Sequence, residues 1–471
     1  MKIFSARLKR MMSLGFIVMQ VSMSVCAQTF YNARDLTTNN MFENALHSHM
    51  LHYQSQADYW LNYLTGFVYQ YSKPEQFGAL FMPVDRPCVS VKQNGTGDVN
   101  SGWFDLNSTS GDGFDGVLCI NPQRKVYAML NQFHFCLDPY ICGLWFEVNF
   151  AYEHVNQETG CKMTTRSAPG SEEALKNITE AGLCCGTFKE TAINDVELKG
   201  GYDFVFQNND YVGIYIVGTV PQHKNRIETN DCFFKPWIAT NHGSCGFGVK
   251  GGHTLWSCDD RTVRLMTDMK YRYVFSADEI RQFDLENNGP WSRYLLLASR
   301  SDPAKSYHNI TIFTEQASVT PRSVVDWWTG LNLTRGDLGF EIGYDLWWRE
   351  AERITGMEKD SLPGNVGIFD IAGHTTSAST ATISQGAGPD NKAQSDSTFI
   401  GLGSKKLDPN SAVQQAALSQ TFYAALSWSS KVNDCPVMVG FGASYEGALR
   451  NNGVKATLDQ WSVFVDGSIN F

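Results

Sequence analysis

Residues 459–471, DQWSVFVDGSINF, alternate between two kinds of side chain. One parity is largely apolar and comprises Trp461, Val463, Val465, Gly467, Ile469 and Phe471. The other is largely polar and comprises Gln460, Ser462, Phe464, Asp466, Ser468 and Asn470. Because successive side chains of a strand point to opposite faces, one face would meet lipid and the other a wet interior. The stretch therefore predicts the closing strand of a β-barrel that lies in a membrane.

The composition of the 471-residue chain agrees with such a barrel. Aromatic residues make up 13% and charged residues 18%, whereas soluble domains carry roughly 25% charged residues. Past residue 30, no run reaches the roughly 18 apolar residues that suggest a spanning helix. The net charge of -10 argues against nucleic acid and anionic lipid as partners. A secreted β-sandwich fits the same composition almost as well.

The N-terminus predicts export across the inner membrane. Residues 11–25 are mostly apolar, and they follow the basic residues Lys2, Arg7, Lys9 and Arg10. Val25-Cys26-Ala27 then matches a small-residue cleavage site. Cys26 raises the alternative of a lipoprotein, although the residues before it do not fit that signal. We predict a cleaved signal peptide over 1–27.

Period-two alternation recurs along the chain and predicts further strands. They cover residues 59–71, 125–135, 144–152, 195–207, 211–220, 245–256, 261–275, 291–299, 309–320, 324–334, 338–349, 422–431, 437–446 and 459–471. Counting all candidates gives about 16 strands, in a range of roughly 12–18, and bacterial barrels use even numbers. The predicted fold is an all-β, transmembrane antiparallel barrel with long extracellular loops and a few short helices.

The rest of the chain divides around this barrel. We assign residues 28–56 to an N-terminal periplasmic segment or plug and residues 57–471 to the barrel, with long loops at 84–122, 156–186 and 359–419. The first segment contains His47, His49 and His52, whose spacing could bring imidazoles onto a metal. A solvated histidine cluster is the simpler explanation, so no metal is expected.

The chain has 12 cysteines, and all but Cys26 follow residue 27. In an exported protein some of these should pair, and the odd number leaves at least one free or bonded between chains. Cys184 and Cys185 are adjacent, and neighbouring cysteines rarely pair with each other because the geometry is strained. We expect each of the two to find another partner or to stay reduced.

Charged residues on the polar parity of the strands are the strongest functional signal. The predicted lumen-lining set is Glu147, Glu153, Glu341, Asp345, Arg349, Lys431, Glu446 and Asp466. A Lys or Arg facing hydrocarbon would cost about 2–4 kcal/mol near the membrane midplane. The set is mostly acidic, which suggests a mild cation preference. The alternative is that these charges pair with one another and only make the barrel rigid.

Signatures of catalysis are weak. No Gly-x-Ser-x-Gly elbow, His-Glu-x-x-His helix or phosphate loop occurs in the sequence. Ser244 follows His242 in HGSCG, which resembles a nucleophile beside a base. Glycine-rich strand starts produce such strings readily, so we expect no enzymatic activity and no cofactor.

Together these features resemble Gram-negative outer-membrane porin-like barrels. The C-terminal assembly signal of that family has apolar or aromatic residues at the last and third-last positions, which Phe471 and Ile469 match. The glycine usual five residues before the end is displaced, because Asp466 occupies that place and Gly467 follows. The cysteine content is also similar to that of chlamydial-type major outer-membrane porins, in which disulfides cross-link the envelope.

The resemblance implies an outer-membrane location, with membrane lipid, the barrel assembly machinery and small polar solutes or ions as partners. The expected function is a pore for passive diffusion of ions and small polar solutes, and a homo-oligomer is left open. Two alternatives remain. One is a structural, disulfide-linked envelope protein with a plugged barrel, and the other is a secreted β-sandwich binding protein.

Overall fold

The computed structural model describes residues 27–45, 60–73, 77–93, 96–106, 113–205, 210–222, 232–299, 306–307, 312–357, 366–370, 382–385, 398–401, 406–433, 435–451 and 454–471. The predicted signal peptide lies outside these residues except for Ala27, and so do His47, His49 and His52. Within the described residues, no helix has the length and apolar character to cross a membrane.

Twelve of the described strands form one closed antiparallel barrel. They are β1 (Leu61–Ser72), β5 (Gln123–Cys136), β6 (Leu144–Glu158), β9 (Val196–Val205), β10 (Tyr211–Val220), β11 (Ser244–Cys258), β12 (Arg261–Val274), β18 (Arg322–Arg335), β19 (Leu338–Arg349), β24 (Ala417–Val432), β25 (Cys435–Ala448) and β28 (Gln460–Asn470). Each pairs with the next wall strand along the chain, and β1 pairs with β28 to close the ring. A further strand, β8 (Thr187–Ile193), pairs with β6 outside the ring.

The expected count of about 16 strands is therefore wrong. Twelve of the predicted strands overlap the wall strands, but those over 291–299 and 309–320 do not belong to the wall. They contain η5 (Ser292–Tyr294), β15 (Leu297–Ser299) and β17 (Thr314–Thr320). A short strand packed on a separate core alternates in the same way as a wall strand, so periodicity could not distinguish them.

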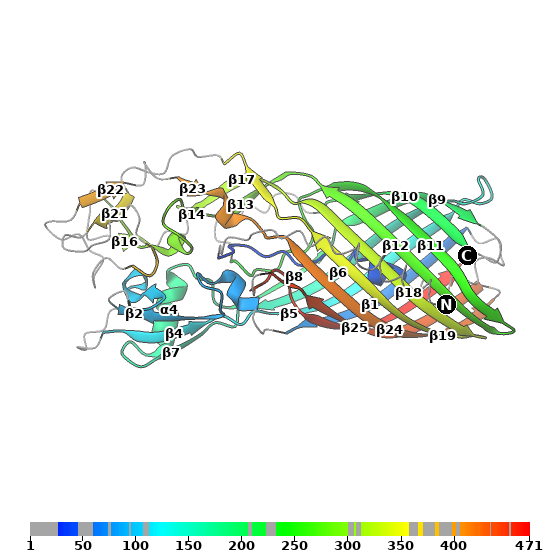
Figure 1. Ribbon diagram of the computed structural model, residues 1–471, viewed down its shortest axis with the longest axis horizontal. Coiled ribbons are helices and arrows are strands. Elements are labelled where there is room, and N and C mark those ends of the chain that lie inside the picture. Colours follow the sequence, from blue (N-terminus) through cyan, green and yellow to red (C-terminus); the bar gives the residue numbers. More distant parts are fainter. Residues whose placement is uncertain are drawn as a thin grey trace, which may run out of the picture.

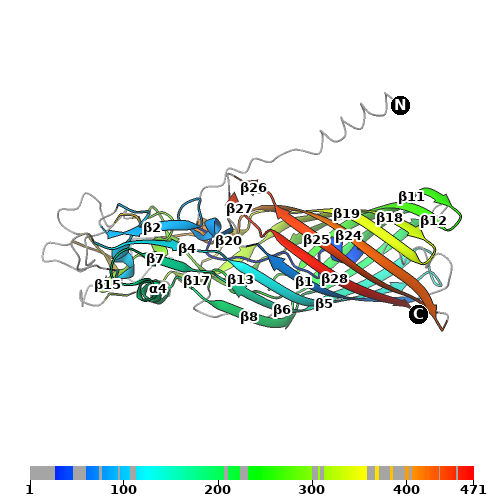
Figure 2. The same cartoon turned by 90° about the horizontal axis from the view of Figure 1, so that it is seen from below.

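The two ends of the barrel differ. At one end, here called the turn end, neighbouring strands are joined by the short links 137–143, 206–210, 259–260, 336–337 and 433–434, and Phe471 lies beside Leu61. At the other, the loop end, the links are long and carry further structure (Figures 1 and 2). Since short turns of outer-membrane barrels face the periplasm, we expect the loop end to be extracellular.

The long links fold into a domain, the cap, made of the structured elements between the wall strands at the loop end. Its elements are η1 (Phe77–Phe81), β2 (Cys88–Lys92), β3 (Val99–Asn100), η3 (Ser101–Phe104), β4 (Asp115–Cys119), β7 (Lys162–Thr165), α4 (Ser171–Glu180), β13 (Ala277–Gln282), β14 (Asp284–Leu285), η5, β15, β16 (Ser306–Tyr307), β17, β20 (Arg353–Thr355), β21 (Val366–Asp370), β22 (Thr398–Gly401), β23 (Leu407–Asp408) and η7 (Pro409–Ala412). The short pair β26 (Arg450–Asn451) and β27 (Val454–Lys455) lies in the last link.

The cap has a hydrophobic core of its own. Trp103, Phe114, Trp291 and Phe313 are fully buried in it, although they come from two different links, the first two from β1–β5 and the last two from β12–β18. The predicted loops over 84–122, 156–186 and 359–419 thus differ from the structure, because they contain cap strands, and because β24 begins at Ala417. Their apolar residues are too scattered along the sequence to show a period, and only tertiary contact gathers them.

Three disulfides in the described part of the chain fasten the cap: Cys88–Cys119, Cys161–Cys185 and Cys184–Cys232. The prediction that Cys184 and Cys185 find separate partners is confirmed. Described cysteines outside the cap are free: Cys136, Cys142, Cys245, Cys258 and Cys435. Disulfide bonding is therefore concentrated at the extracellular end.

Candidate functional site

The two faces of the wall differ in chemistry. In β28, Val463 and Val465 are 45% and 51% exposed on the outside, whereas Asp466 is buried on the inside. In β19, Phe340 and Ile342 point outward, while Glu341 and Asp345 are buried. An apolar exterior around a polar interior reverses the usual order of a soluble protein, and it is the arrangement of a barrel whose solvent is lipid.

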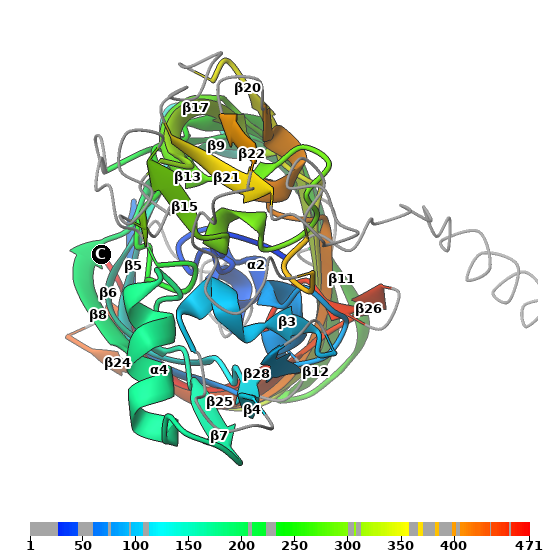
Figure 3. The same ribbon diagram turned by 90° about the vertical axis from the view of Figure 1, so that its left-hand side faces the viewer.

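The lumen is not empty. Residues 27–45, here called the plug, enter it from the cap and end in the helix α2 (Asn40–Asn44), which Figure 3 shows inside the ring of strands. At the upper end, the Gln28 amide donates to the Leu80 carbonyl at 2.8 Å, and Tyr31 is part of the cap core. Lower down, the ring of Phe42 meets Phe464 of β28 edge-on, with centroids 5.8 Å apart. The plug thus connects the cap core to the middle of the barrel.

The sequence NNMFEN produces α2 for local reasons. The Asn39 side chain accepts a hydrogen bond from the Met41 amide at 3.0 Å and so caps the helix. This short helix places Met41 and Phe42 in a buried apolar cluster and turns Glu43 toward the wall. Isolated helices of one turn are unstable in water, so α2 depends on its contacts in the lumen.

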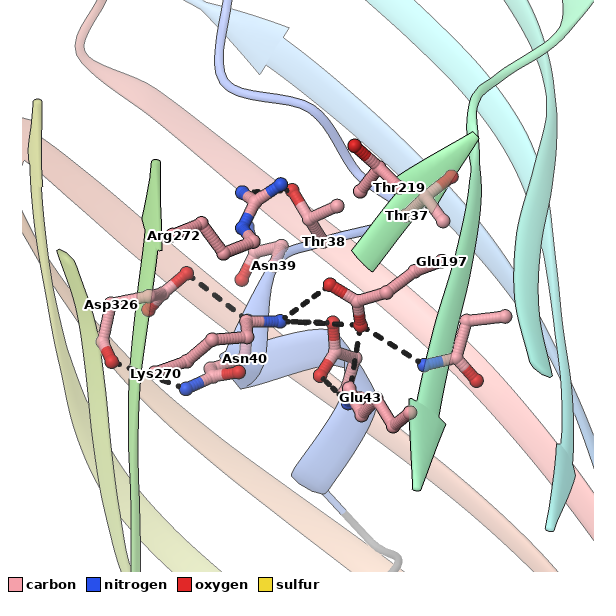
Figure 4. Close-up of polar contacts among 12 residues, drawn as sticks. Thr37, Thr38, Asn39, Asn40, Glu43, Glu197, Thr219, Lys270, Arg272 and Asp326 are labelled. Atoms are coloured by element: carbon pink, nitrogen blue, oxygen red, sulfur yellow. Dashed lines mark hydrogen bonds and ion pairs between the residues drawn. The ribbon is translucent and has the colours of Figure 1, made fainter. Parts of the chain in front are cut away.

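Glu43 lies between two lysines of the wall. Lys270 of β12 approaches Glu43 at 2.7 Å and Glu197 of β9 at 3.1 Å (Figure 4). Lys199 of β9 also pairs with Glu43, and it reaches Glu147 of β6 at 3.0 Å. All these side chains are buried. Burying such charges costs several kcal/mol per ion unless each is paired, and here carboxylates and ammonium groups alternate.

A second anchor lies on the two wall strands that follow β12, β18 and β19, and Asp326 of β18 is the direct cross-strand partner of Lys270. Arg34 of the plug donates to Asp345 of β19 at 2.6 Å and to Asp326 of β18 at 2.7 Å. The Asn40 amide also donates to Asp326, at 3.3 Å, as Figure 4 shows. Arg34 and Glu43 thus hold the plug against the arc of the wall that runs from β9 to β19.

The fit around the plug leaves little free space. Cavities lined by Glu43, on either side of α2, measure about 20 Å³ each. Such a volume holds about one water molecule. In the described part of the chain, the cavities beside Glu43 are therefore too small for a solute larger than water.

A larger cavity, of about 100 Å³, lies above α2 where the plug meets the cap. His242, Glu279, Trp347 and Arg349 are among its lining residues. His242 lies outside the wall strands, and both its ring nitrogens face acceptors at 2.7 Å, namely the Phe275 carbonyl (Nδ1) and Glu279 (Nε2). Burial alone would lower the pKa of His242, but the bond to Glu279 raises it above the usual value. Burial would raise the pKa of Glu279, but Arg281 and His242 hold it at about 2.

The structure places most of the predicted lumen residues on the inside. Asp345 binds Arg34, Arg349 donates to the Asn32 carbonyl at 3.1 Å, and Glu147 pairs with Lys199. The others in the lumen contact the wall or its links: Glu153 with Asn194, Glu341 with Tyr423, and Glu446 with Gln460; Asp466 is buried in β28. Lys431 is exposed at the turn end of β24. These residues are spread around the wall, and only part of the set meets the plug.

Sequence reasoning missed the wall residues that hold the plug most directly, namely Glu197, Lys199, Lys270 and Asp326. The signal was present, because residues 261–275 alternate Arg264, Asp268, Lys270 and Arg272 with outward apolar residues. The same parity rule would have found this row. Arg34 and Glu43 of the plug had no such signal, since a segment without a repeating face gives no direction to its side chains.

The remaining candidates can be placed briefly. Ser244 shares a hydrogen bond with Thr219 at 2.7 Å, and His242 is turned toward Glu279. Among the described residues, no group of three or more His, Cys, Asp or Glu side chains is arranged to hold a metal ion. Ile469 of the predicted assembly signal pairs with Tyr63 of β1, and the Phe471 amide donates to the Leu61 carbonyl at 2.8 Å.

The fold and the apolar exterior define an outer-membrane β-barrel protein. No family model matches the chain, and no curated protein matches it. Solved structures that resemble it include an outer-membrane channel from Pseudomonas putida F1, at 10% identity and a TM-score of 0.39, which covers 88% of this chain and 97% of that one.

Two other solved structures are similar at this level. The translocator domain of the autotransporter NalP from Neisseria meningitidis has 7% identity and a TM-score of 0.33, covering 91% of this chain and 98% of that one. The toluene transporter TbuX from Ralstonia pickettii has 9% identity and a TM-score of 0.29, covering 88% and 90%. Values this low imply nothing about what this chain binds or transports. The likeness to chlamydial-type porins is not shown by these comparisons.

Proposed function

We propose that this protein is a gated outer-membrane channel for ions and small polar solutes, and that the plug is its gate. The observation that carries the proposal is that the barrel closes without the plug. β1 pairs with β28 through eleven residue pairs, whereas the plug contributes no strand to the wall. The plug can therefore move while every wall hydrogen bond is kept. No catalytic group takes part.

The polar wall favours polar solutes once the plug has moved. Glu147, Glu197, Lys199, Lys270 and Asp326 would then face water. The cation preference expected from the sequence stays a prediction, because Lys199 and Lys270 are matched by Glu197 and Asp326 and leave the excess of carboxylates unchanged. We infer a lumen of mixed charge, and the reversal potential under asymmetric salt reports its preference.

One observation favours a second candidate, a structural envelope protein whose barrel stays closed. Tyr31 and Ala27 belong to the cap core, so the upper plug is held by apolar packing as well as by ion pairs. A permanently closed barrel would then serve as the anchor of the extracellular cap. The secreted β-sandwich is excluded, because the twelve strands close into a ring with an apolar exterior.

A double variant, Arg34→Ala with Glu43→Gln, distinguishes the two candidates. It leaves Asp326, Asp345, Lys199 and Lys270 with fewer buried partners, which costs about 3–5 kcal/mol for each broken pair. When the plug has left the lumen, here called the released form, the wall charges meet water and this cost does not apply. The released population should rise by on the order of a hundredfold, and single-channel recordings in planar bilayers should show openings that are rare in the unmodified protein.

The matched control is Lys176→Ala with Glu180→Ala, which removes an exposed ion pair from α4. Such pairs contribute little, so conductance should not change. Folding is checked by heat-dependent migration on gels. A double variant that folds but conducts no more than the control would refute the gate and support the structural anchor.

A further inference from the structure

The outer face of the barrel carries a groove at the turn end, with a volume of about 770 Å³. It crosses strands β11, β12, β18, β19, β24 and β25. Its floor is formed by outward-facing apolar side chains: Val263, Leu333, Leu338, Phe340, Leu426, Val439 and Phe441. Several are widely exposed, among them Phe441 at 59% and Leu338 at 61%. This surface is concave and apolar where most of a barrel wall is convex.

Two arginines lie at the edge of the groove. Arg261 begins β12 and Arg335 ends β18, and the two are direct cross-strand partners with side chains on the outer face. Like charges directly opposite each other are destabilising in a sheet. Asp260 lies 3.9 Å from Arg261 and 3.8 Å from Arg335, too far for a hydrogen bond to either. The pair is therefore open to a further anion.

We propose that this groove binds a glycerophospholipid with a phosphoethanolamine headgroup from the periplasmic leaflet. The phosphate bridges Arg261 and Arg335 through charge-assisted hydrogen bonds. The headgroup ammonium lies toward Asp260, and the acyl chains cover the apolar floor. A headgroup without net charge suits two cations with a carboxylate between them, in a protein of net charge -10.

The depth of the groove identifies the leaflet. Trp256 and Trp428 lie at its edge, and tryptophan gathers at the membrane–water interface. The turn end is periplasmic, so the lipid comes from the inner leaflet of the outer membrane and not from lipopolysaccharide. A second copy of the chain fits less well, because a two-fold contact at the same depth would bring two arginine pairs together.

The test uses the full-length protein purified in detergent, with phosphatidylethanolamine added and bound lipid counted by native mass spectrometry. Arg261→Gln with Arg335→Gln should weaken binding about tenfold or more, as expected for the loss of strong phosphate contacts. Arg261→Lys with Arg335→Lys keeps the charge and should retain part of the binding. The matched control is Arg166→Gln, an exposed arginine of the cap that lies 3.9 Å from Asp115.

Selective loss of lipid in the double glutamine variant, with the control unchanged, supports the site. Equal binding in all variants overturns it, and so does equal binding of a neutral diacylglycerol, since the arginines would then have no role. Preference for lipopolysaccharide over phosphatidylethanolamine overturns the assignment to the periplasmic leaflet. If the double variant does not fold, the single Arg335→Gln variant is measured by the same criteria.

Discussion

Individual buried charges determine where the plug lies. A buried ion pair often adds little net stability, because desolvation offsets the attraction. Here the buried ion pairs fix the position of the plug. Glu43 is paired where both Lys199 and Lys270 reach it. Arg34 is paired between Asp326 and Asp345. A displaced plug that stayed out of contact with water would leave these charges unpaired.

His242 gives the mouth of the barrel a dependence on pH. Its two nitrogens face only acceptors, so the bonded form is the imidazolium. The pKa of His242 is higher in the folded protein than the ordinary value of 6.5. The protonated ring therefore stabilises the fold fully below pH 6.5, and this stabilisation is lost as the pH rises through the pKa of the folded state. Glu279, with its pKa at about 2, keeps its charge throughout. We predict that the urea midpoint falls as pH rises from about 6 to about 9.

The comparison for this prediction is His242→Gln, in which that component of the pH dependence should be absent. Glu352 and Arg281 also surround the site, and both are present in the two proteins compared. His154→Gln changes an exposed histidine bonded to Thr191 and should keep the unmodified pH profile. A His242→Gln profile parallel to that of the unmodified protein would show that the ring does not titrate with folding.

Single elements of the wall are shaped by close packing inside a narrow ring. Gly330 of β18 and Gly343 of β19 are cross-strand partners, and a Cβ on Gly343 would collide with the ring of Tyr423. The two glycines let Tyr423 and Trp328 lie inside the wall, where the Trp328 indole donates to the Tyr423 hydroxyl at 2.9 Å. A residue larger than glycine at either position would therefore displace the ring of Trp328 or of Tyr423.

The cap strands depend on covalent support that the wall strands do not need. Cys88–Cys119 joins cross-strand partners of β2 and β4. We predict that Cys88→Ser with Cys119→Ser destabilises the cap by about 2–4 kcal/mol. Limited proteolysis should then cut within the cap, while the barrel keeps its heat-dependent migration.

Cys245→Ser is the control, because this free cysteine lies on the outer face of β11 and should leave the proteolysis pattern unchanged. A barrel that unfolds together with the cap would mean that the two form one cooperative unit. Reductant should reproduce the pattern of the double variant without changing the mass of the species, if the disulfides are intramolecular.

Across the whole molecule, cap, plug and barrel form one continuous path. The plug runs from the cap core into the lumen, and the first wall strand, β1, begins at the turn end (Figures 1 and 2). Because the plug is packed into the cap core, the movement that we propose for the plug would also disturb the cap. This coupling would respond to contacts outside the cell only if the cap is extracellular.

Thiol labelling of intact cells tests that orientation. A membrane-impermeant maleimide should label Glu173→Cys on α4, because α4 belongs to the extracellular cap. Native Cys142 and Cys258 are exposed at the turn end and should react only after the outer membrane is permeabilised. Peptide mapping separates the sites. Labelling of Cys142 in intact cells would invert the assignment of the two ends.

The sequence by itself determined the wall. Alternation is a local property, because each strand must show one face to lipid and one to the lumen, and this requirement holds residue by residue. The same rule located Glu147, Glu341 and Asp345 on the inside. The alternation rule gave too many strands, because the cap strands also alternate, with one face packed on the cap core and not on the lumen.

Only the tertiary structure decided what closes the lumen. Arg34 and Glu43 lie in a segment without periodicity, and their partners are distant in sequence, so no local pattern pairs them. The cap core likewise gathers Trp103, Trp291 and Phe313 from links that look irregular one at a time. The final strand, 460–470, determined that a barrel exists; the pairing of distant buried charges determined that this barrel is plugged.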